Sequence, residues 1–267
     1  MIKTRVIPLL LLKDGLLKKP VQFVKRQRTV ANPISIVRVF ESRQVDELIM
    51  LDIGSAARNM NVNPEIVRMI SEELTVPFTC GGGIKSVETM GSLISAGAEK
   101  VTINTSAVEN PNLIDQGARR FGSQCIVVSI DAKETESGGY QVLTENGTKP
   151  TGLVPAIWAK EAEKRGAGEI LINSIDRDGT MKGFDLRLIS SVSQSVQIPV
   201  IAAGGAGTPQ HFSEAVIKGG ASAVAAGSIY HFRRTTPDMV KSSMIEANIP
   251  VRRPSSYNAK NFSRGLQ

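Results

Sequence analysis

The stretch TVPFTCGGGIKSVETMGSLISAGA (75–98) returns, with changes, as QIPVIAAGGAGTPQHFSEAVIKGGA (197–221). Each copy begins with a short apolar run, passes through a cluster of glycines and continues in a helix-like pattern. A second pair of stretches, DELIMLDIG and GEILINSID, has the same offset, since Gly83 to Gly205 and Glu47 to Glu169 both span 122 positions (205 − 83 and 169 − 47). A constant offset predicts that the chain consists of two related halves.

Strand-like and helix-like segments alternate along the whole chain. Working outward from the repeat, we count eight such units, beginning with the apolar run RVIPLLLLK (5–13). Eight strand–helix units in about 250 residues predict an α/β fold, a closed (β/α)8 TIM barrel made of two half-barrels, about 1–122 and 123–250. An open doubly wound sheet is the alternative, but it would require neither eight strands nor a repeat. We expect residues 251–267 to form a basic, flexible tail.

The net charge of +7 is concentrated locally. Basic residues gather in the tail and in KKPVQFVKRQR (18–28), while aromatic residues make up only 4% of the chain. Without a basic segment rich in stacking rings, we expect no nucleic-acid binding. Anionic small molecules or an acidic partner surface account for the charge instead.

Cysteine usage and hydropathy bear on the compartment. Cys80 and Cys125 both lie in apolar, strand-like runs, which favours buried reduced thiols and a cytoplasmic protein. No apolar run approaches 18 residues, so we expect no membrane span. His211 and His231 have no metal-ligand partner at useful spacing, so we predict no metal and no cofactor.

Glycine-rich turns follow several predicted strands. Glycines at a strand–helix junction let the backbone approach an anion, and the helix N-terminus supplies N–H donors and the positive end of its dipole. Matched loops in the two halves predict two phosphate cups, and hence a phosphorylated small-molecule ligand with a phosphate at each end. Tight turns alone are the alternative reading. The predicted phosphate-binding residues are Gly82, Gly83, Asn104, Thr105, Asp178, Gly179, Gly204, Gly205, Gly227 and Ser228.

Asp176 lies beside the second cup, in SIDRDGT (174–180). It could cap the next helix in an Asx turn, or it could bind a hydroxyl group of a ligand. The sequence leaves both readings open.

The motifs together resemble the HisF family, the cyclase subunit of imidazole glycerol phosphate synthase. The resemblance covers about residues 3–253 and implies a barrel that docks by its N-terminal face on a HisH-type glutaminase. Ammonia would cross the barrel and be joined to a bisphosphorylated nucleotide before imidazole ring closure. The motifs that carry it are GGGI, INT-AVENP, FGSQ, VVSIDAK, EKRGAGEIL, SIDRDGT, GGAG, HF-EA and HFR.

The resemblance also implies two catalytic aspartates, at the ends of the first and fifth strands. Asp131 matches the second of them, but the first falls on Leu11. Aligning the halves through Lys13 and Lys133 also places Leu11 opposite Asp131. Lys19 matches a catalytic lysine on the family's mobile first loop, although Pro20 replaces the following glycine.

Four charged residues at the starts of predicted strands match the family's ammonia gate. They are Arg5, Glu47, Lys100 and Glu169, and two positive and two negative groups can neutralise one another at the N-terminal floor of the barrel. Ordinary exposed charges at strand ends are the alternative reading.

Three functions follow from these residues. The first is a HisF-like subunit that passes ammonia to a sugar amidotransferase, as in WbuZ-type paralogues linked to surface-polysaccharide amidation, with ring closure impaired by Leu11. The second is an authentic cyclase subunit in histidine biosynthesis. The third is a non-catalytic scaffold that activates the glutaminase. We rank them in that order.

Overall fold

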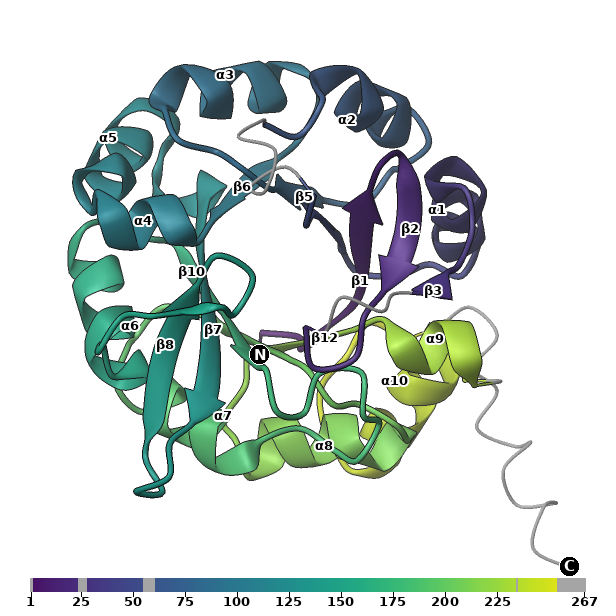
Figure 1. The fold of residues 1–267 in the computed structure, drawn as a ribbon. Helices are drawn as coiled ribbons and strands as arrows, with labels where there is room; N and C mark the ends of the chain where they lie inside the picture. The colour runs from purple at the N-terminus through teal and green to yellow at the C-terminus, as the bar shows by residue number, and fades with distance from the viewer. Residues whose placement is uncertain (1, 24–27, 55–60, 234, 254–267) are drawn as a thin grey trace, which may run out of the picture.

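The structure is a computed structural model that describes residues 2–23, 28–54, 61–233 and 235–253. Parallel strands form a ring in this part of the chain, and helices surround it (Figure 1). The strands of the ring are β1 (Arg5–Lys13), β4 (Leu48–Asp52), β5 (Phe78–Gly81), β6 (Lys100–Ile103), β7 (Ile126–Glu134), β10 (Glu169–Ser174), β11 (Val200–Ala203) and β12 (Ala223–Ala226).

The ring is closed. Strand β12 pairs in parallel with β1, and β7 pairs in parallel with β10 over six positions, so the described sheet has no free edge among these eight strands. The predicted (β/α)8 barrel is therefore confirmed, and the open doubly wound sheet is wrong. The boundaries of the half-barrels stay a prediction, and residues 254–267 of the predicted tail lie outside the described residues.

Helix starts follow local capping rules. The side chains of Asn32, Asn63, Ser86, Asp185 and Thr236 each accept a hydrogen bond from a backbone N–H of the following first turn. The helices are α1 (Pro33–Ser42), α2 (Pro64–Ser71), α3 (Val87–Ser95), α4 (Thr105–Glu109), α5 (Asn112–Phe121), α6 (Pro155–Lys164), α7 (Leu186–Ser193), α8 (Pro209–Ile217), α9 (Ser228–Phe232) and α10 (Pro237–Glu246), with a 3-10 turn, η2 (Ser123–Cys125), before β7.

Two short helices stand where the sequence predicts only loops. Helices α4 and α9 begin directly after Asn104 and Gly227, at the ends of β6 and β12. Each gives a predicted phosphate-binding loop a single helical turn of N–H groups. Among the described residues, no helix has both the length and the hydropathy needed to cross a lipid bilayer.

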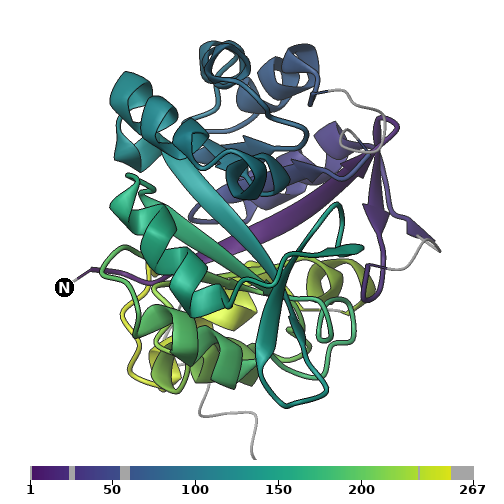
Figure 2. The same ribbon diagram turned by 60° about the vertical axis from the view of Figure 1, so that its left-hand side comes forward.

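Short hairpins extend the barrel at one end. Strand β2 (Leu16–Lys19) folds back on β1 and pairs with β3 (Arg28–Thr29), and β8 (Tyr140–Thr144) folds back on β7 and pairs with β9 (Lys149–Pro150). These hairpins follow the carboxyl ends of β1 and β7, and the N-terminus lies at the other end of the barrel (Figure 2). Lys19, expected on a loop, is the last residue of a strand.

Successive side chains of each strand point alternately into and out of the barrel, which gives two apolar layers. One layer lies between the strands and the helices and includes Val6, Leu10 and Met50. The other fills the inside of the barrel and consists of Ile7, Leu9, Ile49, Val127, Leu171, Ile201, Ala203, Ala223 and Ala225. Position 11 on β1 therefore has the same inward direction as Ile7 and Leu9.

A buried ion pair ties the last helix to the barrel. Lys241 on α10 is 0% exposed, and its Nζ lies 2.7 Å from Asp46 Oδ1 and 2.9 Å from the carbonyl oxygen of Gln44. The other Asp46 carboxylate oxygen accepts a hydrogen bond from the backbone N–H of Val6 at 2.9 Å. Removing one partner of such a pair leaves an uncompensated buried charge.

We therefore expect Lys241→Ala to lower the free energy of unfolding by about 3–5 kcal/mol, because Asp46 would stay buried without its cation. Urea denaturation measures this change. Lys218→Ala is the matched control, since its pair with Glu214 is exposed and should contribute about 0.5 kcal/mol or less. Equal losses in the two variants would contradict the prediction.

Candidate functional site

Asp131 lies inside the mouth of the barrel, near the carboxyl end of β7. Its side chain is 8% exposed and is held by two asparagine amides from the neighbouring strands. Asn104 Nδ2, just after β6, donates to Asp131 Oδ2 at 2.7 Å, and Asn173 Nδ2, on β10, donates to Asp131 Oδ1 at 3.2 Å. The carboxylate is thus fixed from both sides.

Burial raises the pKa of Asp131 to about 6. The hydrogen bonds from Asn173 and Asn104 oppose this shift because they favour the charged form, while the negative charge of Asp178 adds to it. A carboxyl group with a pKa near 6 can both accept and return a proton close to neutral pH.

Leu11 occupies the position on β1 that corresponds to Asp131 on β7. Leu11 pairs with Leu51 on β4, and Asp131 pairs with Asn173 on β10. Leu51 and Asn173 each stand four residues after a glutamate of the repeat, Glu47 and Glu169. One side of the mouth therefore carries an aspartate and an asparagine, whereas the equivalent side carries two leucines.

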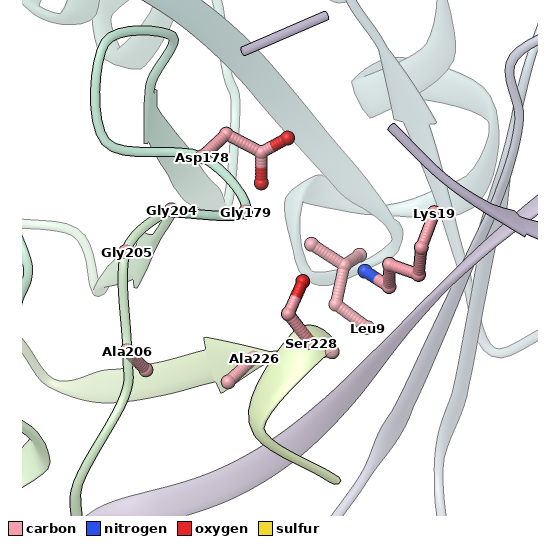
Figure 3. Close-up of a pocket in the computed structure, with 10 residues that line it drawn as sticks. Leu9, Lys19, Asp178, Gly179, Gly204, Gly205, Ala206, Ala226 and Ser228 are labelled. Carbon is pink, nitrogen blue, oxygen red and sulfur yellow. The ribbon is translucent and has the colours of Figure 1, made fainter. Parts of the chain in front are cut away.

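The second predicted phosphate cup is formed, and Lys19 lies inside it. The cup is a small cavity whose lining includes all six second-half residues predicted for it (Figure 3). Lys19 and Asp178 enter this cavity from opposite sides. The lining residues are Leu9, Lys19, Asp178, Gly179, Gly204, Gly205, Ala206, Ala226, Gly227 and Ser228.

Gly227 makes the position of Lys19 possible. A Cβ atom at residue 227 would lie 2.0 Å from Lys19 Nζ and 2.5 Å from the carbonyl oxygen of Leu9. The remaining cavity is about 20 Å³, close to the smallest space that holds one water molecule. A phosphate group could therefore enter only when the Lys19 amine moves.

Lys19 and Asp178 influence each other's protonation. Burial lowers the pKa of Lys19, and the negative charge of Asp178 opposes that shift. Burial raises the pKa of Asp178, and the charge of Lys19 opposes that shift. The cup therefore holds one basic and one acidic side chain whose charges act on each other.

The strand that carries Lys19 is docked on the loop after β10. The backbone N–H of Gln22 donates to the carbonyl oxygen of Asp178 at 3.0 Å, and Gln22 Nε2 donates to that of Asp176 at 2.8 Å. Gly179 has a φ angle of +70° and packs closely against Pro20. A Cβ atom at position 179 would lie 2.8 Å from the Pro20 carbonyl oxygen. The Asp176 side chain accepts a hydrogen bond from the Glu134 N–H at 2.8 Å, so it braces the hairpin.

The first predicted cup is arranged differently. Gly82 and Gly83 have positive φ angles of 129° and 69° and turn the chain sharply after β5. The Thr105 hydroxyl accepts a hydrogen bond from the backbone N–H of Glu145, in the turn between β8 and β9, at 3.1 Å. The Asn104 side chain points to Asp131. The structure therefore brings the second set of predicted residues together more completely than the first.

The four predicted gate residues form one alternating ring at the opposite end of the barrel. Arg5 Nη1 lies 2.5 Å from Glu47 Oε2 and 3.1 Å from Glu169 Oε1. Lys100 Nζ lies 3.2 Å from Glu47 Oε2 and 3.1 Å from Glu169 Oε1. Each cation thus contacts both anions. Burial acts to lower the pKa of Arg5, but the two glutamates outweigh it and raise that pKa.

A polar wall runs between this ring and Asp131. Thr79 on β5 donates from Oγ1 to Glu47 Oε1 at 2.8 Å, and Thr102 and Ser129 follow on β6 and β7 as buried inward residues. The other inward residues are apolar and include Ile7 and Leu9 on β1, Leu171 on β10 and Ile201 on β11, and also Val127 on β7 itself. Three hydroxyl side chains on β5, β6 and β7 thus lie between the charged ring and Asp131, within an otherwise apolar interior.

Two residues of this arrangement escape sequence reasoning. Asn173 was not predicted because its role depends on pairing with a strand 42 positions earlier. Asn173 stands four residues after Glu169, and this spacing is the sequence feature that could have identified it. Thr102 lies in the apolar run KVTI and carries no motif. Among the described residues, no three His, Cys, Asp or Glu side chains are grouped as they would be around a metal ion.

Comparison with known proteins agrees with the fold and the motifs. The family model described as "Histidine biosynthesis protein" matches residues 5–236. The imidazole glycerol phosphate synthase subunit HisF of Anoxybacillus flavithermus (strain DSM 21510 / WK1) is 46% identical over 253 residues, which cover 94% of this chain and 100% of that protein. The HisF subunit of Geobacillus kaustophilus (strain HTA426) is 45% identical over the same lengths. The chain therefore belongs to the histidine biosynthesis protein family, as a HisF-like member.

Proposed function

We propose that this chain is the HisF-like subunit of a glutamine amidotransferase complex. It receives ammonia from a HisH-type glutaminase at its N-terminal face and conducts it through the barrel to Asp131. The relatives are named as subunits of imidazole glycerol phosphate synthase, which supports a partner subunit. The observation that carries the proposal is the polar wall that leads from the charged ring to one carboxylate, with a leucine at the equivalent position across the mouth.

The ring suits a gate for a neutral molecule. Its charges cancel within the four side chains, so no net charge attracts or repels a passing ion. Thr79, Thr102 and Ser129 then offer hydroxyl groups that can exchange hydrogen bonds with ammonia. The other inward side chains below the mouth are apolar and offer no hydrogen-bond partner, so its route passes these three hydroxyl groups on β5, β6 and β7.

Leu11 limits proton transfer at the mouth of the barrel. Ring closure needs proton donation and proton acceptance, and a leucine side chain can do neither. Asp131 would have to perform both steps in succession, and losing one partner of an acid–base pair costs about 100- to 10,000-fold in rate. We propose that ammonia is instead passed on to a separate sugar amidotransferase that acts on a surface-polysaccharide sugar.

A second candidate is the cyclase reaction itself, as in histidine biosynthesis. The pKa of Asp131, raised to about 6, favours it, because one group could then alternate between base and acid. The formed second cup and the names of the relatives favour it as well.

Turnover with the bisphosphorylated nucleotide and free ammonia separates these two candidates. We expect the chain to be about 100- to 10,000-fold slower than the Anoxybacillus HisF subunit, because it lacks one proton-transferring group. Leu11→Asp should raise the rate, whereas Leu11→Asn, which is polar but not acidic, should not. Wild-type turnover equal to that of the relative would favour the cyclase.

The pH dependence of the same residual reaction reports on Asp131. At a fixed concentration of unprotonated ammonia, we expect the rate to fall as pH decreases through about 6, because protonation removes the base. Asn173→Leu removes a hydrogen bond that favours the carboxylate, so the midpoint should move to higher pH. Asn112→Leu, on the outer helix α5, is the control. An unchanged midpoint in Asn173→Leu would refute the assigned pairing.

The gate is tested by isotope competition in the complex with the glutaminase. With glutamine labelled by 15N at the amide and unlabelled ammonium in the medium, conduction through the barrel keeps the label in the product. Lys100→Met leaves Glu47 and Glu169 without one cation, so we expect the labelled fraction to fall. Lys160→Met, an exposed change on α6, should leave it unchanged. A labelled fraction unaffected by Lys100→Met would support a scaffold instead.

A further inference from the structure

The loop between β10 and α7 forms one wall of the second cup. Residues 175–185, called the cup loop from here on, contribute Asp178 and Gly179 to the lining of the cavity (Figure 3). Later in the loop, the backbone N–H of Gly183 donates to the carbonyl oxygen of Gly205 at 2.8 Å. Gly205 is itself part of the lining. The shape of the cup therefore depends on how this loop is held along its length.

The cup loop has contacts on two sides. On the side of the cavity, the strand that carries Lys19 is docked on it through Gln22. The amine of Lys19 fills the cup and has to move before an anion can enter. On the outer side the loop meets the hairpin of β7 and β8, where Tyr140 and Asp185 lie outside the lining of the cavity. The outer contacts are thus the ones that an incoming anion leaves in place.

Asp185 joins three elements at the end of the cup loop. Its Oδ1 accepts a hydrogen bond from the backbone N–H of Leu188 at 3.1 Å, which caps α7, and one from the Tyr140 hydroxyl group at 2.7 Å. Its Oδ2 accepts a hydrogen bond from Oγ of Ser174, the last residue of β10, at 3.4 Å. One carboxylate therefore ties the two ends of the loop together, and Tyr140 ties that carboxylate to β8.

Arg187 determines the direction of the hydrogen bond between Tyr140 and Asp185. Its guanidinium carbon lies 4.7 Å from the centroid of the tyrosine ring, and its Nε donates to the Tyr140 oxygen at 3.1 Å. Because a guanidinium group can only donate, the tyrosine proton is left to point at Asp185. Arg187 Nη2 also donates to Glu134 Oε1 at 2.6 Å, so one side chain contacts both strands of the hairpin.

The Tyr140 hydroxyl group keeps its proton at neutral pH. Burial raises the pKa of Tyr140 to about 12; the carboxylate of Asp185 adds to this shift and the guanidinium of Arg187 opposes it. The donor that holds Asp185 is therefore present throughout the pH range in which the protein would act.

We propose that Tyr140 is a positioning residue for the second cup. By holding Asp185 from outside, it keeps the cup loop against Gly205 while an anion displaces the Lys19 amine. Tyr140 touches no ligand and acts through Asp185. The role rests on the second cup binding a phosphate group, as predicted, and adds the hairpin to the parts of the chain that determine its affinity. Because β7 also carries Asp131, the same hairpin sets the position of the phosphate group relative to that carboxylate.

A titration of the intact chain with inorganic phosphate at constant ionic strength tests this role. The backbone N–H NMR signals of Gly205 and Ser228 report on the second cup, which both residues line. Tyr140→Phe keeps the aromatic ring and removes only the hydroxyl group. We expect it to raise the dissociation constant for phosphate about tenfold, the effect of losing one hydrogen bond to a charged group.

A double-mutant cycle separates positioning from a general loss of structure. Asp185→Ser retains a side chain that can cap α7 but removes the carboxylate that Tyr140 holds. In this background, Tyr140→Phe should change the dissociation constant by less than about twofold, because the tyrosine acts through Asp185. Full and independent effects of the two substitutions would contradict the role.

Thr135→Val is the matched control within the same hairpin. Thr135 Oγ1 lies 3.0 Å from Ser137 Oγ and accepts a hydrogen bond from the Gly139 N–H at 3.1 Å, so its contacts belong to the tip of the hairpin. The substitution should leave phosphate affinity unchanged. Thermal unfolding of each ligand-free variant measures stability separately, and we expect affinity to change in Tyr140→Phe even where the two variants lose equal stability.

Two results would overturn the positioning role alone: a dissociation constant in Tyr140→Phe within about twofold of the wild-type value, or an equal weakening in Thr135→Val. A wild-type chain without a saturable phosphate shift at Gly205 and Ser228 would refute the second cup as a phosphate site, and the positioning role with it. Neither result bears on ammonia conduction, which the 15N competition measures independently.

Discussion

Closure of the strand ring is the constraint on which the rest of this structure depends. When β7 pairs with β10 and β12 pairs with β1, the sheet acquires an inside that side chains reach only at every second residue. Arg5, Ile7, Leu9 and Leu11 therefore form one inward row. The inward residues of the eight strands form successive layers along the barrel: the charged ring, the lining of the interior and the mouth. A shift of one residue in any strand would point its inward side chains outward.

The internal repeat of the sequence allows the two sides of the mouth to be compared residue by residue. The two halves place equivalent residues opposite each other, so Asp131 and Asn173 on one side can be compared directly with Leu11 and Leu51 on the other. A site with one polar and one apolar side resembles a binding surface for a polar small molecule more than a symmetric acid–base pair. This asymmetry is the feature on which the proposal of ammonia delivery without ring closure rests.

Much of the fold could be predicted from sequence because its signals are local or repeated. The offset of 122 positions indicated the halves, and alternating segments indicated the eight strands. The site was predicted less completely. Asn173 acts through Asp131 on a neighbouring strand. The Glu145 N–H that donates to Thr105 comes from a hairpin turn whose three-dimensional course no local pattern specifies. Helices α4 and α9, each five residues long, are too short for a periodic signal.

Lys19 has a consequence for how an anion would be received. Folding has already removed its amine from water and set it beside Gly227, so that dehydration is complete before any ligand arrives. An incoming anion would displace the Lys19 amine from beside Gly227 and would raise its depressed pKa, so that anion binding and proton uptake become thermodynamically linked. The single missing methyl group at position 227 is what permits this coupling.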